Sequence, residues 1–469
     1  MNKAFLFLAL LLIAVDGWTA PASIPDTTRR FTIGKITITG NKITRPSVIL
    51  RELTFREDSV LAASVLAADI QKSRENLFNT SLFNTVDIDT AAVPGSPGVL
   101  EVTIRVIERW YFWPIPYLEF PNRNINAWLR DPLFKRLTYG ANISFFNSRG
   151  RNETLTLLLH FGYNRKYGFT YTVPYINARK TWGIGFGADA ALNHALQVSV
   201  GDNHNKYLET GSHLLQQHYS AYAEVTHRPA WYLYHTLNVS YHNYVFDDTL
   251  RSVTGFFAGD SSLYQQFVTL SYKIKLDKRD VRFYPLKGYY ADLILTKPGI
   301  GGGYHDLFSA QANLRGYWNP FSRWYLAAAV TVRLSSPEVQ PFFLQESHGT
   351  GRDYVRGYDD CIIPGHHYLI ARTNVRYALL PERIIRIPAG SPKFSVAPCA
   401  LYLNLFCDGG YVWNDDPVQS SENSLCNTFL LGYGTGLDFT TYYNVVIGVS
   451  GTMNIQGKPR AFIHFIAPI

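Results

Sequence analysis

The 469-residue chain is poor in charged residues and lacks long apolar segments after its N-terminus. Charged side chains make up 17% of the chain, whereas soluble domains average roughly 25%. Beyond the N-terminal run, no segment reaches the about 18 uninterrupted apolar residues that a transmembrane helix needs. The sequence therefore predicts that this is not a helical membrane protein.

Cysteine is scarce, and the motifs of common enzyme sites are missing. None of the cysteines forms a Cys-x-x-Cys pair, so neither a zinc site nor a thioredoxin-type motif is indicated. The chain also lacks His-Glu-x-x-His, Gly-x-Ser-x-Gly and phosphate-loop motifs. We expect no catalytic residues, no metal and no cofactor. An exported compartment permits disulfides, but the spacing leaves any pairing open among Cys361, Cys399, Cys407 and Cys426.

The net charge of +8 is dispersed and contains no basic block. An excess of basic residues can indicate nucleic-acid binding. The dispersed pattern instead favours a modestly basic lumen and basic side chains near lipid headgroups. We expect a lipid bilayer as a partner and no nucleic acid.

The N-terminus has the layout of a secretory signal peptide. Lys3 precedes an apolar run of 12 residues, 4–15, and the small residues Ala20-Pro21-Ala22 follow. A membrane anchor needs a longer run. The sequence predicts a signal peptide over residues 1–22, cleaved after Ala22 or, as the alternative, after Ala20.

Residues 31–109 separate from the rest and predict a small α+β domain. Its expected elements are a strand at 31–39, a short helix capped by Thr44, a helix at 61–78, and strands at 82–88 and 100–107. The order of these elements and the segment Ile38-Thr39-Gly40-Asn41 resemble the POTRA module. That resemblance implies capture of extended client segments by strand addition at a sheet edge.

From residue 110 onward, aromatic residues and short alternating segments dominate. The chain is 15% aromatic, and segments such as 154–163 and 236–244 alternate apolar and polar residues between turns. Segment 368–379 places Arg372 and Arg376 on one regular face, which favours a polar lumen over a dry core. The predicted fold class is mainly β, with a transmembrane antiparallel β-barrel over residues 110–469. A soluble secreted β-protein with an adhesive role is the competing interpretation.

Three short motifs lie in the second half of the chain. The first is Val355-Arg356-Gly357-Tyr358, inside a glycine-rich segment, 347–367. The second is the strand-like Phe406-x-Asp408-x-Gly410. The third is a hairpin-like pair, Asp277-x-x-Asp280 followed by Pro285-x-x-Gly288. A guanidinium such as that of Arg356 can pair with a carboxylate through two charge-assisted hydrogen bonds.

Together with the signal peptide and the small domain, these motifs resemble the BamA/TamA superfamily of outer-membrane assembly and translocation barrels, also called the bacterial surface antigen family. The resemblance implies about 16 strands, which the 360 residues of 110–469 allow at about 22 each. It also implies that the loop 347–367 folds into the lumen. Arg356 would then pair with Asp408 on the wall, and Gly410 would leave space for the loop backbone.

The first and last strands should meet at a seam, which the family uses as a lateral gate. We expect the first strand within 110–120 and the last within 459–469. Pro114 and Pro116 remove two N–H donors from the first of them. A seam that is poorly paired would be easier to open.

The resemblance implies an outer-membrane barrel of a Gram-negative bacterium with its POTRA domain in the periplasm. Such a barrel inserts or translocates unfolded outer-membrane or secreted client proteins, with periplasmic chaperones or accessory lipoproteins as further partners. The alternative function is a passive pore or a surface structural protein that keeps the scaffold.

Overall fold

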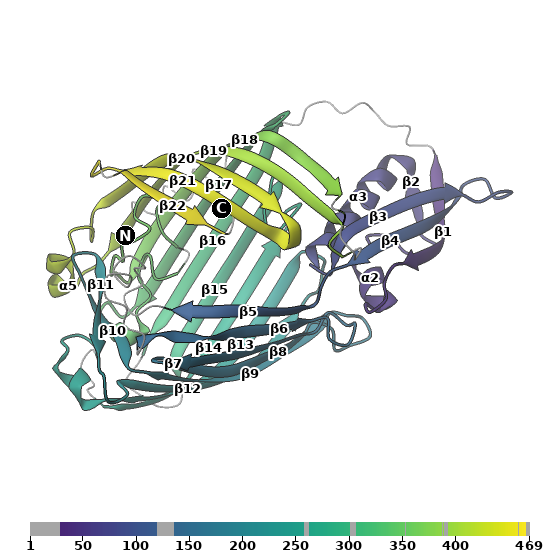
Figure 1. Ribbon diagram of the computed structural model, residues 1–469. Coiled ribbons are helices and arrows are strands. Elements are labelled where there is room, and N and C mark those ends of the chain that lie inside the picture. The colour runs from purple at the N-terminus through teal and green to yellow at the C-terminus, as the bar shows by residue number, and fades with distance from the viewer. Residues whose placement is uncertain are drawn as a thin grey trace.

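A computed structural model describes residues 29–119, 136–257, 262–300, 306–351, 353–386, 388, 393–457 and 459–465. Figure 1 shows a small N-terminal domain at one end of a long barrel of strands. The predicted signal peptide, 1–22, and the end of the predicted last strand, 466–469, lie outside the described residues. In the described part of the chain, no helix is long and apolar enough to cross a membrane.

The N-terminal domain is a four-stranded sheet covered by two helices. Its sheet has the order β2-β1-β4-β3, with β1 and β4 parallel, and the helices bury Val48, Ile49 and Leu77 against Ile33 and Ile104 of the sheet. The elements are β1 (Arg30–Thr39), α2 (Pro46–Glu52), β2 (Val60–Ala62), α3 (Ala63–Asn79), β3 (Phe83–Ala92) and β4 (Val99–Glu108). Strand β2 has only three residues, too few for an alternating pattern to predict it.

The prediction that Thr44 caps the first helix is wrong. The N-cap is Arg45, which makes no side-chain cap hydrogen bond, and Pro46 begins the helix. Thr44 is buried instead, and its hydroxyl lies 3.1 Å from that of Tyr111 and 2.9 Å from the amide nitrogen of Asn147. The Thr44 hydroxyl therefore contacts the barrel segment instead of capping its own helix.

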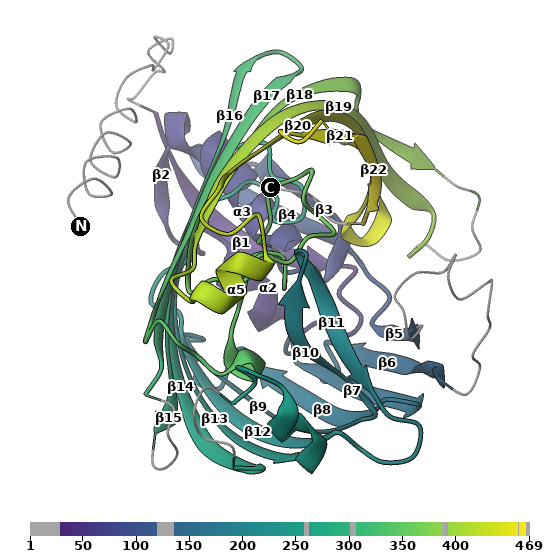
Figure 2. The same ribbon diagram turned by 90° about the vertical axis from the view of Figure 1, so that its left-hand side faces the viewer.

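Among the described residues, sixteen strands form one antiparallel sheet that curls into a barrel (Figure 2), which confirms the predicted fold class. Each strand pairs with the next in the chain, except that a separate hairpin, β10 (Ala195–Gly201) and β11 (His204–Glu209), is inserted between β9 and β12. The barrel strands are β5 (Phe112–Glu119), β6 (Thr138–Phe146), β7 (Thr154–Gly162), β8 (Arg165–Val173), β9 (Trp182–Asn193), β12 (Gln216–His227), β13 (Leu233–Phe246), β14 (Tyr264–Asp277), β15 (Gly288–Ile300), β16 (Phe308–Phe321), β17 (Trp324–Ser336), β18 (His367–Arg386), β19 (Val396–Trp413), β20 (Phe429–Thr441), β21 (Val445–Asn454) and β22 (Pro459–His464).

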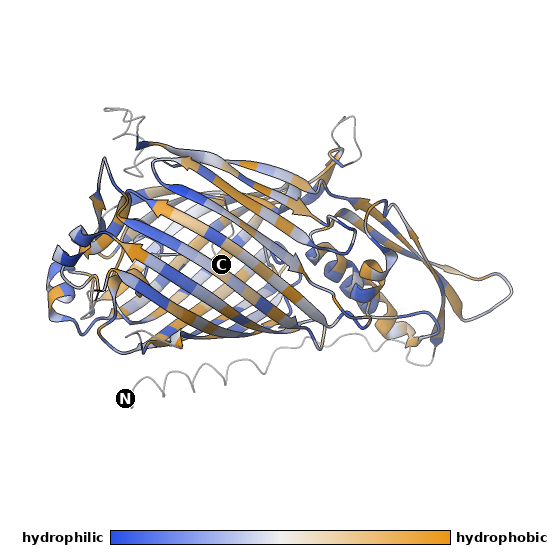
Figure 3. Cartoon of the chain, turned by 90° about the horizontal axis from the view of Figure 1, so that it is seen from below, coloured by the Kyte–Doolittle hydropathy of each residue, from blue (hydrophilic) through white to orange (hydrophobic). Residues whose placement is uncertain are grey.

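Hydrophobic and hydrophilic residues alternate along these strands (Figure 3). In β21, Val445, Ile447 and Val449 are exposed on the outer face, while Ser450 and Asn454 are buried on the inner face. Because successive side chains of a strand point to opposite faces, the alternation gives the barrel an apolar exterior and a polar interior.

Loops fold over the end of the barrel that lies away from the N-terminal domain. The β10–β11 hairpin and the short helix α5 (Pro417–Glu422) both lie at this end (Figure 2). At the hairpin tip, the Asn203 N–H donates to Oδ1 of Asn423 at 2.9 Å, and its carbonyl accepts from the Ile362 N–H at 2.8 Å. The hairpin thus contacts the segment 347–367 directly.

Candidate functional site

The segment 347–367 connects β17 to β18 and packs against the inner wall of the barrel. Val355, Tyr358 and Ile363 are fully buried, and they share one apolar cluster with Val412 and Leu430 of the wall. Within the segment, the Val355 N–H donates to Nε2 of His348 at 2.9 Å. The loop therefore lies inside the barrel.

Arg356 extends from this loop to Asp408 on β19. Its Nε and Nη2 each lie 2.6 Å from an oxygen of the carboxylate, and its own N–H donates to Oδ2 at 3.2 Å. The rest of the guanidinium donates to Asn374 Oδ1 at 2.7 Å and to the Thr373 carbonyl at 3.0 Å, and it lies 3.9 Å from the centre of the Phe406 ring. The Arg356 side chain is 5% exposed and that of Asp408 is fully buried. The pair satisfies both charges, which an unpaired buried ion could not do.

Glycines in the wall make room for the loop. A Cβ at Gly410 would lie 2.6 Å from Cγ2 of Val355, and one at Gly432 would lie only 1.7 Å from the Arg356 carbonyl oxygen. Gly410 thus accommodates the Val355 side chain rather than the loop backbone that the sequence had suggested. It is Gly432, which no sequence motif indicated, that accommodates the loop backbone. Gly357 has φ +94°, a conformation that favours glycine.

The third motif forms the turn between β14 and β15, which reaches the N-terminal domain. Asp277 pairs with Arg279 at 2.7 and 2.9 Å, and Oδ1 of Asp280 accepts from two N–H groups of the turn. The Pro285 carbonyl accepts from buried Arg376 at 2.9 Å. Gly288 has φ +98°, and a Cβ there would lie 2.2 Å from a carbonyl oxygen. The motif residues shape the turn, and none of these four contacts Arg356 or Asp408 in the described hydrogen bonds.

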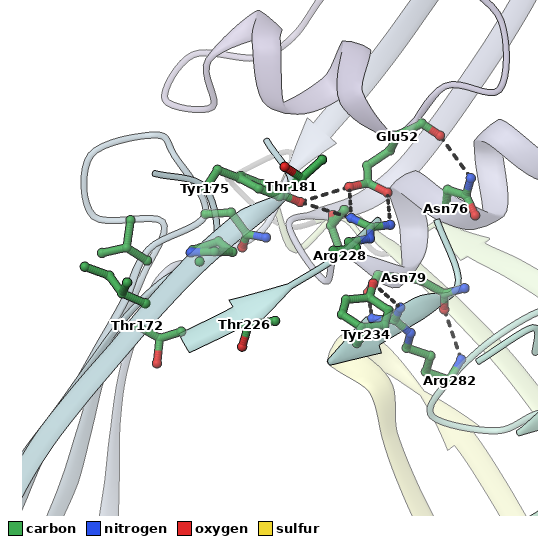
Figure 4. Close-up of a pocket in the computed structure, with 16 residues that line it drawn as sticks. Glu52, Asn76, Asn79, Thr172, Tyr175, Thr181, Thr226, Arg228, Tyr234 and Arg282 are labelled. Carbon is green, nitrogen blue, oxygen red and sulfur yellow. Dashed lines mark hydrogen bonds and ion pairs between the residues drawn. The ribbon is translucent and has the colours of Figure 1, made fainter. Parts of the chain in front are cut away.

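A second buried ion pair, which the sequence analysis missed, joins the two parts of the chain (Figure 4). Glu52, at the end of α2, accepts from Arg228, in the turn after β12, at 2.6 and 2.8 Å. The Tyr175 hydroxyl donates to Glu52 at 2.9 Å. The group borders a cavity of about 250 Å³ between the domain and the barrel. The side chain of Arg228 is 10% exposed and that of Glu52 is 3% exposed.

The electrostatics of this second pair favour both charged forms. Burial alone would raise the pKa of Glu52, but the hydrogen bonds and charge of Arg228 outweigh it and lower the pKa below its ordinary value. Burial alone would lower the pKa of Arg228, but Glu52 raises it above the ordinary value. Glu52 is therefore ionised at neutral pH and holds Arg228 in place.

Further contacts attach the domain to several turns of the barrel. Asn79 donates to the Asp280 carbonyl at 2.8 Å, the Arg45 N–H donates to the Gly150 carbonyl at 2.9 Å, and Arg109 donates to Asn444 at 2.8 Å. Because these turns follow β14, β6 and β20, the domain is fixed at separated points of one end of the barrel.

The family model of the Omp85 superfamily domain matches residues 147–441. The chain belongs to the Omp85 superfamily. A second model, the POTRA family described as a surface antigen variable number repeat, matches residues 31–109. A search of the curated proteins finds no match.

Similar solved structures include BamA from Haemophilus ducreyi lacking POTRA domains 1–3. It is 17% identical with a TM-score of 0.49, and the match covers 93% of this chain and 83% of that one. CdiB from Escherichia coli is 13% identical with a TM-score of 0.53, over 92% of this chain and 75% of that one. At 13% identity, the likeness to CdiB from Escherichia coli shows the fold alone.

Membership of the Omp85 superfamily makes this chain an outer-membrane barrel for protein assembly or translocation, with one POTRA domain. Members of this kind are not enzymes, as expected from the missing catalytic motifs. The outer membrane is that of a Gram-negative bacterium, and the POTRA domain is periplasmic. The turns that contact the POTRA domain therefore lie at the periplasmic mouth, and the β10–β11 hairpin lies at the extracellular end.

Proposed function

We propose that this barrel takes unfolded outer-membrane or secreted proteins from the periplasm and assembles or translocates them, and that this requires the loop–wall pair Arg356–Asp408. The observation that carries the proposal is the bidentate pair itself. It holds a loop from the extracellular end against the inner wall, with both side chains almost fully buried. The loop packs against β19 and β20. These strands precede β21 and β22, and β22 is the last strand before the seam.

The POTRA domain supplies a place where a client segment can bind. Strand β3 is one edge of the POTRA sheet, and its residues 84–87 line a cavity of about 420 Å³ between α3 and the barrel. Glu382 and Tyr402 of the barrel line the same cavity. A strand added to the β3 edge would thus lie at the periplasmic mouth.

The test is whether the purified protein, inserted in phospholipid vesicles, accelerates folding of a urea-denatured eight-stranded outer-membrane protein. Folding is followed by the heat-modifiable migration of that probe on a gel. We expect acceleration by the wild type and its loss in Arg356→Ala. The matched control is Arg251→Ala, since Arg251 pairs with Asp248 in an exposed loop, at 52% and 81% side-chain exposure.

A passive pore is the competing function. It predicts steady ion conductance in the same vesicles and no acceleration of probe folding. If the wild type conducts ions and leaves the folding rate of the probe unchanged, the assembly proposal fails.

A further inference from the structure

Strands β18 and β19 run beyond their neighbours at the periplasmic end of the barrel. The ladders that join them to β17 and β20 stop, while β18 and β19 stay paired with each other. Residues 380–386 and 396–399 therefore form a two-stranded ribbon outside the barrel wall, which we call the periplasmic ribbon. Figure 1 shows these strands reaching the POTRA domain, where the side chain of Asn84 donates to the Lys393 carbonyl at 2.6 Å.

The periplasmic ribbon forms one wall of the cavity of about 420 Å³ that also borders β3 and α3, a volume within the range of ligand pockets. Ile384 lines the cavity and is 63% exposed. Its neighbour Ile385 points to the other face of the ribbon, because successive side chains of a strand alternate. Further apolar lining comes from Phe78, Val281, Phe283, Leu286 and Val396. An apolar surface of this kind that is open to water favours an apolar occupant.

The charged side chains around this cavity are mainly acidic. In the described chain, the lining acids are Glu75, Asp87, Asp280 and Glu382, and the one lining cation is Arg74. Glu75 binds Lys72 at 3.0 Å, whereas the other three acids take part in none of the described ion pairs. Burial raises the pKa of Asp280, and the charge of Glu75 adds to the rise. A cation that enters the cavity would relieve this repulsion, so the cavity favours a positively charged partner.

We propose that this cavity receives a large apolar side chain from an unfolded client segment in which lysine or arginine flanks that side chain. The apolar walls bury the side chain, and the carboxylates of the cavity pair with the flanking cations. Segments with acidic flanks are disfavoured, because like charges repel at close range. This inference rests on the proposed function, and it adds which client segments the periplasmic end of the protein selects.

The experiment measures, by fluorescence anisotropy, the binding of three short fluorescent peptides to the purified full-length protein in a neutral detergent. The first peptide has a phenylalanine between lysines, the second has the phenylalanine between glutamates, and the third has a serine between lysines. We expect the first to bind roughly tenfold more tightly than either of the others. Its advantage over the second should shrink when the salt concentration rises from about 0.1 M to about 1 M, because the Debye length falls from about 10 Å to about 3 Å.

Two pairs of variants separate the cavity from the surrounding surface, and all four replaced side chains are exposed, so the fold should tolerate them. Glu382→Lys should weaken binding of the lysine-flanked peptide roughly tenfold and strengthen binding of the glutamate-flanked one. Its control is Glu101→Lys, on β4, since Glu101 does not line the cavity. Ile384→Ser should weaken binding of both phenylalanine peptides. Its control is Ile385→Ser, one residue along the ribbon, where the side chain is 48% exposed and lies outside the cavity lining.

Equal affinity of the wild type for the lysine-flanked and glutamate-flanked peptides would overturn the inference, as would equal effects of Ile384→Ser and Ile385→Ser. If the wild type accelerates folding of the denatured eight-stranded probe but binds none of the peptides, the inference fails while the proposed function stands. If the wild type does not accelerate folding, the proposed function itself fails, whatever the peptides do.

Discussion

Two buried arginine–carboxylate pairs hold this protein together, and they differ in what they join. Arg356–Asp408 joins a loop to the wall of the same barrel, 52 residues along the chain. Arg228–Glu52 joins two domains, 176 residues apart. Breaking a buried pair leaves an uncompensated charge, so the loss of either partner should weaken the junction that the pair forms. The first pair holds the loop 347–367 against the inner wall, and the second holds the POTRA domain against the turn after β12.

The largest effect should come from Asp408→Ala, because it leaves the Arg356 guanidinium buried without its carboxylate. Such a loss costs about 3–5 kcal/mol, so we expect the loop to leave the wall. Cys361, in the loop, is 5% exposed and should become reactive to a hydrophilic maleimide, as read by peptide mass spectrometry. Cys399, buried on β19, is the internal control. A protected Cys361 in an inserted Asp408→Ala barrel would contradict this account of the first junction.

Gly432→Ala tests the same junction without touching either charge. The new methyl group would overlap the Arg356 carbonyl, so the loop backbone must move away from β20. We expect Cys361 labelling to rise, by less than in Asp408→Ala because the ion pair can re-form after a small shift. Gly451→Ala is the matched control, since a Cβ there meets nothing within 4 Å. Equal labelling in the two glycine variants would show that the loop does not need the space at 432.

Glu52→Ala should loosen the second junction and leave the first intact. We expect faster amide exchange of the Arg45 N–H, which donates to Gly150 across the junction, with Cys361 still protected. The effect should be smaller than that of Asp408→Ala, because Arg228 keeps the Trp231 carbonyl and partial exposure. Arg105→Ala is the control, since its pair with Asp89 is more than half exposed and such pairs contribute about 1 kcal/mol or less.

Acid should produce the smallest effect, again at the second junction. The pKa of Glu52 lies below its ordinary value of 4.5. Its ionised form therefore stabilises docking fully above pH 4.5, and this contribution is lost as the pH falls through the lowered pKa. Exchange at Arg45, corrected for the intrinsic pH dependence, should rise as the pH falls from 4.5 through the lowered pKa of Glu52. In Glu52→Gln, the corrected exchange rate at Arg45 should no longer depend on pH over this range. A pH dependence that persists in this variant would show that another group causes the effect.

The sequence predicts the first junction and misses the second for a physical reason. Arg356 and Asp408 lie in short motifs that resemble those of the superfamily, and that resemblance implies their pairing. Glu52 follows Val48 by one helical turn and is a charged residue on an apolar face, which is a weak signal of a buried partner. Nothing in the turn at Arg228 identifies that partner.

The alternation of apolar and polar residues along the strands predicts the barrel, because its outer face contacts lipid and its inner face is polar. It cannot predict which glycine of the run Gly432-x-Gly434-x-Gly436 meets the loop, since that depends on tertiary register. Thr44 shows the same limit. The local sequence fits a helix cap, but in the folded protein the Thr44 hydroxyl contacts the hydroxyl of Tyr111 instead. Local sequence patterns thus specify the helices and strands, whereas the contacts between them depend on tertiary packing.

The most direct test of the account is a double-mutant cycle at the first junction. The folding rate of the denatured eight-stranded probe in vesicles is measured with wild type, Arg356→Ala, Asp408→Ala and the double variant, each confirmed as inserted by heat-modifiable migration. We predict matching losses in the single variants and no further loss in the double variant, because both remove one shared interaction. Losses that add, or unchanged rates in all three inserted variants, would contradict the claim that this pair serves client assembly.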